Sequence, residues 1–182
     1  TLAPGANLRL VVLRKNLVGS CRAERKLAMV GARARLSYSW AVTGGSHSYF
    51  RFDADLAGRG GRADWAGAFL AQGGETVVHC DAHHRASETI SRNESRGVVR
   101  SGGRAVFKGM IKIDRVARRA DAHLGQRTLL VGDQAFAKSL PELEINQSDV
   151  KAGHAATVST LDEEALFYLA TRGIGRADAE KL

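Results

Sequence analysis

The sequence of 182 residues contains only two cysteines, Cys21 and Cys80, and only two prolines. Two cysteines are too few for the disulfide framework of a small secreted domain, and a chain of this length can bury a core without one. No stretch approaches the roughly 18 consecutive apolar residues of a membrane-spanning helix, and no secretory leader is recognisable. We therefore expect a soluble, cytoplasmic protein with no membrane partner.

Aromatic residues are also scarce, at 6%, and no basic run is interleaved with them. The net charge of +8 is uneven, because residues 1–120 hold 21 Lys and Arg against 9 Asp and Glu, whereas residues 121–182 hold 6 against 10. A basic, β-rich nucleic-acid-binding module is therefore one alternative function. The scattered arginines lack the stacking residues of such modules, so we do not expect nucleic acid to be the main partner.

Two catalytic signatures are absent from the sequence. There is no GxSxG nucleophile elbow and no GxxxxGK[ST] phosphate-binding loop, so neither acyl transfer nor ATP hydrolysis by this chain has support. The acid pairs Asp53/Asp55 and Glu142/Glu144 could serve a carbohydrate-active β-helix enzyme only if they converged in one groove. Alternation along strands explains both pairs more simply, as outward-facing side chains.

Apolar residues recur with a period of two over much of the chain, which is typical of half-buried strands. Residues 32–42 show the pattern best, and 50–56, 105–113 and the run PELEIN (141–146) repeat it, with Leu143 and Ile145 on the apolar side of the last. Leu8 to Leu13 predicts a more fully buried strand. Short glycine-rich turns separate these runs, so an all-β fold follows, either an antiparallel sandwich or a parallel β-helix.

The pattern changes near residue 160. Thr160 and Glu163 have capping-box spacing, and Gly173 follows as a C-cap, so TLDEEALFYLATRGI predicts a helix over 161–172. Residues 176–182 predict the start of a second helix.

The motif HCDAHH (79–84) suggests a metal site, but its side chains alternate along a strand. His79, Asp81 and His83 would lie on one face, and Cys80 and His84 on the other. A zinc site would need further ligands from elsewhere. Whether this motif binds a metal stays open.

Three segments in the C-terminal half resemble the SufB/SufD family of iron–sulfur cluster assembly proteins, and SufD more than SufB: RAVFKGMIKI (104–113), RTLLVGDQA (127–135) and PELEINQSDVKAGHAATVSTLDEEALFYLATRGI (141–174). HHRASETISR (83–92) is similar to a further family segment. The resemblance implies a right-handed parallel β-helix with a short C-terminal helical segment. Residues 1–159 would form the β-helix core, 160–182 would begin the helical segment, and an N-terminal helical region would lie outside this chain.

The resemblance also implies a function. A SufD-like chain would be a non-catalytic scaffold subunit of the SufBCD complex, pairing with a SufB-like subunit through the β-helix. It would recruit a SufC-like ATPase through the C-terminal helices. It would hold no intrinsic cofactor, only a transient iron–sulfur cluster or iron, and when isolated it could form a homodimer.

Individual residues match the family's motifs. His154 falls on a histidine implicated in iron or cluster binding at the SufB–SufD interface, and His84 is an auxiliary metal candidate. Ala152 stands where SufD-like sequences often have cysteine, and Gln126 where SufB has one, so a thiolate ligand would come from a partner. Residues of the LFYL segment would pack on the end of the β-helix or seat the ATPase subunit; the partner-binding candidates are Leu166, Phe167 and Tyr168.

Overall fold

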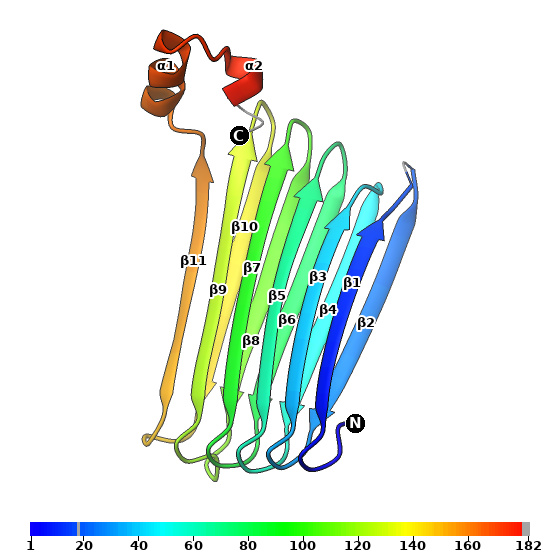
Figure 1. Cartoon of the computed structure of the whole chain (residues 1–182), viewed down its shortest axis with the longest axis vertical. Coiled ribbons are helices and arrows are strands. Elements are labelled where there is room, and N and C mark those ends of the chain that lie inside the picture. Colours follow the sequence, from blue (N-terminus) through cyan, green and yellow to red (C-terminus); the bar gives the residue numbers. More distant parts are fainter. Residues whose placement is uncertain (18, 180–182) are drawn as a thin grey trace.

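The computed structural model describes residues 1–17 and 19–179, which form strands followed by two helices (Figure 1). The strands are β1 (Asn7–Lys15), β2 (Cys21–Val30), β3 (Arg35–Thr43), β4 (His47–Leu56), β5 (Arg62–Ala71), β6 (Glu75–His84), β7 (Ile90–Arg100), β8 (Arg104–Ile113), β9 (Asp121–Val131), β10 (Phe136–Ile145) and β11 (Lys151–Thr160). The helices are α1 (Glu163–Thr171) and α2 (Arg176–Ala179).

The strands build two parallel sheets that lie face to face. Odd-numbered strands form one sheet, in the order β1-β3-β5-β7-β9-β11, and even-numbered strands form the other, in the order β10-β8-β6-β4-β2. Each coil contributes one strand to each sheet, and the coils form about five turns. Figure 1 shows the two layers of strands side by side along the stack. The predicted all-β parallel β-helix with a short C-terminal helical segment is confirmed. The sandwich is excluded, because sandwich sheets are antiparallel.

The repeat that stacks the coils varies in length. Arg35 pairs with Arg62, 27 residues later, whereas Ile90 pairs with Asp121, 31 residues later. Half of this difference comes from the turn between β8 and β9, which is two residues longer than the turn between β4 and β5, and half from β7, which is two residues longer than β3. Because the coils differ in length and in sequence, no fixed period is visible in the sequence.

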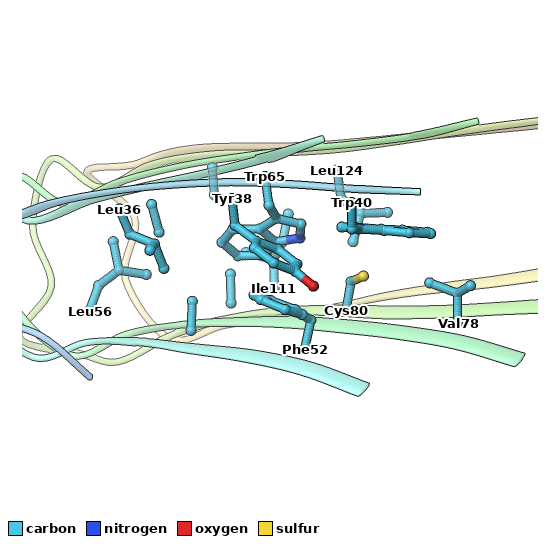
Figure 2. Packing of buried hydrophobic residues seen from close by; sticks show 14 of the residues in the cluster. Leu36, Tyr38, Trp40, Phe52, Leu56, Trp65, Val78, Cys80, Ile111 and Leu124 are labelled. Atoms are coloured by element: carbon cyan, nitrogen blue, oxygen red, sulfur yellow. The ribbon is translucent and has the colours of Figure 1, made fainter. Parts of the chain in front are cut away.

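The core fills the narrow space between the two sheets. Leu36, Tyr38 and Trp40 point inward from β3 and are buried, as their alternation predicts. The Tyr38 ring stacks on Phe52 of β4 with ring centroids 3.9 Å apart, and Figure 2 shows these rings meeting between the layers. This packing joins β3 of one sheet to β4 of the other across the core.

The first strand contradicts its prediction. Leu8, Val11 and Leu13 are 44%, 57% and 73% exposed, although the run predicts a buried strand. β1 pairs only with β3 among the described residues, so it lies at the edge of the sheet in this part of the protein. An apolar run by itself does not distinguish a central strand from an edge.

The helical segment follows β11 and lies beyond the ends of the strands (Figure 1). Asp162, not Thr160, caps α1: its side chain accepts a hydrogen bond from the Glu164 backbone N–H at 2.9 Å. Thr160 is the last residue of β11 and is therefore unavailable as the cap. Gly173 has φ 83°, and its N–H donates to the Ala170 carbonyl, so the predicted C-terminal glycine is confirmed.

The second predicted helix begins at Arg176 as α2, and its predicted continuation over 180–182 lies outside the described residues. Neither helix in the described part of the chain is long and apolar enough to cross a membrane.

Candidate functional site at the open end of the sheets

β11 is the last strand of its sheet, and it leaves one side unpaired. It pairs with β9, and no described strand pairs with its other edge. On the face directed into the β-helix, Ala152, His154, Ala156 and Val158 continue the rows begun by Ala122, Leu124, Gln126 and Thr128 of β9. The β9 residues are buried, whereas His154 and Val158 are exposed. The C-terminal end of the β-helix is therefore open.

The opposite sheet ends in the same way. Leu143 and Ile145 of β10 lie in register with Ile111 and Ile113 of β8, which are fully buried. Their alternation with Glu142 and Glu144 is as predicted, yet Leu143 and Ile145 are 40% and 42% exposed. No described strand covers them. Both sheets thus expose apolar side chains at the end of the β-helix that carries His154.

His154 lies beside both positions at which this chain departs from the family pattern. Ala152 is two residues earlier on the same face of β11, and Gln126 of β9 lies in register with Ala156, two residues later. The His154 imidazole has no hydrogen-bond or ion-pair partner in the described residues. Gln126 is 2% exposed, and its Oε1 atom also has no partner among them. The structure therefore gathers the three positions on one face of two neighbouring strands.

His84 has a different environment, at the end of β6 beside the turn to β7. It is fully buried; its Nδ1 lies 2.8 Å from Thr89 Oγ1 and its Nε2 lies 2.9 Å from Ser91 Oγ. Because the Thr89 hydroxyl donates to the Ala86 carbonyl, it accepts from Nδ1–H, and Nε2 accepts from Ser91. Burial lowers the pKa of His84 to about 4, with the neighbouring His83 adding to the shift.

Both ring nitrogens of His84 thus form hydrogen bonds within the chain. These bonds hold the turn between β6 and β7 in place, and we call this the bracing role of His84. Its role as an auxiliary metal ligand stays a prediction.

The other members of HCDAHH separate as the alternation predicts. Cys80 points into the core and is 1% exposed, and burial raises the pKa of its thiol to about 12. His79 and His83 point outward, where His79 Nε2 lies 3.0 Å from Asp81 Oδ1 and His83 Nε2 lies 2.9 Å from Asp114 Oδ1. Across the residues that the structure describes, no group of three or more His, Cys, Asp and Glu side chains is placed to hold a metal.

The outer face of the even-numbered sheet carries a charge network that the sequence does not indicate. Asp53 is 8% exposed and is contacted by Arg25 at 2.8 Å and by Arg51 at 2.9 Å. Arg51 also reaches Asp81 on the next strand at 3.0 Å. Burial raises the pKa of the Asp81 carboxyl, although His79 and Arg51 oppose the shift. These arginines are compensated by neighbouring carboxylates, which weakens the case for a nucleic-acid surface.

The paired acids do not converge. Asp53 and Asp55 lie on β4, whereas Glu142 and Glu144 lie on β10, three strands away in the same sheet. At about 4.8 Å per strand this separation is about 14 Å. It exceeds the roughly 5–9.5 Å between the carboxyl groups of glycosidases. The carbohydrate-active alternative therefore loses its structural basis.

α1 presents a second exposed feature. Leu166 is buried, at 8% exposure, whereas Phe167 and Tyr168 are 73% and 57% exposed. Only the last two of the three partner-binding candidates are thus available at the surface of this chain. The sequence does not distinguish them from Leu166, because the contacts that bury one side of a two-helix segment are not encoded in α1 alone.

These features define a parallel β-helix domain with an open C-terminal end, a histidine there without a partner among the described residues, and an exposed aromatic pair on the following helix. Residues 1–182 match the family model described as SUF system FeS cluster assembly, SufBD core domain. The chain belongs to this SufBD core family, and the predicted SufD-like resemblance is confirmed.

Individual relatives match parts of the chain. It is 40% identical over 92 residues to the iron–sulfur cluster assembly protein SufD of Escherichia coli (strain K12), and 38% identical over 86 residues to SufD of Bacillus subtilis (strain 168). A SufBD family protein of Mycobacterium leprae is 33% identical over 112 residues. These matches cover 50%, 47% and 62% of this chain but 22%, 20% and 13% of the relatives. The aligned part of the chain thus spans between about an eighth and just over a fifth of each relative's length.

Proposed function

We propose that this chain is the β-helical core of a SufD-like, non-catalytic scaffold subunit that acts in iron–sulfur cluster assembly. The observation that carries the proposal is the exposed inner face of β11, which displays an unpartnered His154 at the open end of a SufBD-type β-helix. The absence of a phosphate-binding loop in the sequence is consistent with ATP hydrolysis by a separate subunit.

The open end is the proposed pairing surface for a SufB-like β-helix. An edge strand offers a row of unpaired backbone groups, and a second chain can satisfy them by adding its own strand. Val158, Leu143 and Ile145 are each at least 40% exposed and would be covered by the partner coil. In the absence of a SufB-like partner, the same edge supports self-association as a twofold homodimer.

His154 is the proposed contribution of this chain to a transient iron or cluster site. Imidazole is an accepted iron ligand beside thiolates. Cys80 is buried in the core, and Cys21 lies on β2 at the other end of the stack from β11, so neither supplies a thiolate here. The thiolate ligands would come from the SufB-like partner, and the iron or cluster is cargo held at the interface.

The exposed aromatic pair on α1 is the proposed contact for a SufC-like ATPase. Phe167 and Tyr168 lie on the helix that follows β11 and that extends beyond the ends of the strands (Figure 1). Exposed aromatic side chains are common anchors of protein interfaces. The two proposed partners would therefore bind different parts of the chain.

Anaerobic iron–sulfur reconstitution of the co-expressed complex tests the role of His154. We expect His154→Ala to lower the cluster yield several-fold while leaving the subunits associated. His123→Ala is the matched control, because His123 lies on β9 beside the same region but points outward, 3.5 Å from Glu94. Equal yields from the two variants would remove the role given to His154.

A further inference from the structure

Cys21, His47 and Glu75 form a row across three neighbouring strands. Cys21 opens β2, His47 opens β4 and Glu75 opens β6, and each is paired with the next in the register of the sheet. Because in-register residues of parallel strands point to the same side, all three project from the outer face of the sheet. Cys21 and His47 are exposed. The row lies in the first coils, at the opposite end of the stack from His154.

The first two members are close enough to bind one metal ion. Cys21 Sγ lies 3.8 Å from His47 Nδ1. Zinc binds thiolate at about 2.3 Å and imidazole at about 2.0–2.1 Å, so an ion touching both atoms would subtend an angle of about 120° between them. A tetrahedral site requires about 109°. Small side-chain rotations close the difference.

The surroundings leave room for an ion and further ligands. The pair lies in a surface hollow that Ala23, Tyr49 and Glu75 also line. Glu75 places a carboxylate one strand from His47, and the positive charge of Arg22, which also lines the hollow, is partly offset by Glu24 at 3.3 Å. Among the described residues no third side chain completes a ligand set, so water would occupy the remaining positions. Thiolate with imidazole selects zinc-like transition metals over Mg²⁺ or Ca²⁺.

We propose that Cys21 and His47 form a surface site for a divalent first-row transition-metal ion of the zinc class. Binding replaces the thiol proton with the ion and releases that proton to solvent. The site is independent of the scaffold function proposed above, because it uses other strands and other side chains.

Titration of the whole chain with Co²⁺, under anaerobic reducing conditions, tests the site. Cobalt bound to a thiolate absorbs in the near ultraviolet through ligand-to-metal charge transfer, whereas cobalt bound to histidine alone does not. We expect this band to saturate at one ion per chain and to disappear when Zn²⁺ is added. A chain that shows no such band would overturn the proposal.

Three variants assign the ligands. Cys21→Ser abolishes the band, and His47→Gln weakens Co²⁺ binding roughly tenfold or more, because loss of even an outer-shell partner of a metal ligand costs about 10–100-fold in affinity. Cys80→Ser is the matched control and retains the band, because Cys80 is buried in the core. Circular dichroism verifies that each variant is folded. A band that survives in Cys21→Ser, or an affinity unchanged in His47→Gln, contradicts the assignment.

Discussion

His154 lies in register with Leu124, and the two residues face the same side of the sheet. Leu124 is 2% exposed, whereas His154 is exposed because no further coil follows β11 in the described chain. The row of in-register residues that contains Leu124 and His154 is therefore buried at β9 and exposed at the next strand, β11. A position that would be costly for an imidazole in the middle of the β-helix becomes accessible to a partner at its end.

The pH dependence of stability tests the bracing role of His84. Burial lowers its pKa to about 4, below the value of about 6.5 in an unfolded chain, so the unfolded state binds the proton more readily. The contribution of neutral His84 to the free energy of unfolding is present in full above pH 6.5. It is lost as the pH falls toward 4, and the total loss is up to about 3 kcal/mol. Urea unfolding between pH 7.5 and 4.5 measures the loss.

We expect His84→Gln to flatten this pH dependence and His83→Gln, the outward-facing control, to retain most of it. If His84→Gln shows the same acid sensitivity as the unmodified chain, another group is responsible.

The close packing of the core around Gly67 leads to a second prediction, on stability. A Cβ atom at this position would lie 1.8 Å from the Trp40 indole, so the ring would have to move within a closely packed interior. We expect Gly67→Ala to lower the free energy of unfolding by about 1–3 kcal/mol. Gly153→Ala, on β11, meets nothing within 4 Å and should change it by less than about 0.5 kcal/mol. Chemical denaturation measures both, and equal effects would refute the described packing of Trp40.

Phe167 tests the separation of the two proposed partner surfaces. In its full-length context, Phe167→Ser is expected to weaken capture of a SufC-like ATPase at least tenfold, because it removes the most exposed aromatic anchor of α1. Capture of the SufB-like subunit should be unchanged. Tyr49→Ser, which alters an exposed aromatic on β4, is the control. Pull-down with quantified subunit ratios measures both. Normal ATPase capture by Phe167→Ser would exclude this helix face as the contact.

Much of the fold is predictable from local alternation. Leu36, Tyr38 and Trp40 show their burial directly in the sequence, because side chains alternate across a strand and only one face meets the core. The stacking of coils is not predictable in this way. Strand pairing in the odd-numbered sheet joins residues that are 27 to 31 positions apart in the sequence, and turns of unequal length hide this repeat. The family resemblance supplied the architecture that alternation left open.

The candidate site was predictable only in part. The resemblance identified His154, but exposure of Leu143 and of β11 depends on which strand is last, a property of the assembled sheets. The pairing of His84 with Thr89 and Ser91 likewise follows from how the turn folds back onto β7. The sequence predicts Thr160 as the cap of α1, and this prediction is wrong. β11 continues through Thr160, so Asp162 caps the helix instead.

Copurification with a SufB-like subunit tests the central claim most directly. Val158 is 40% exposed on the open face of β11, whereas Val116, 68% exposed, lies in the turn before β9. We predict that Val158→Asp abolishes capture of the SufB-like subunit and keeps that of the SufC-like ATPase, while Val116→Asp keeps both. Undiminished capture of the SufB-like subunit by Val158→Asp would contradict the assignment of the open end as the pairing surface.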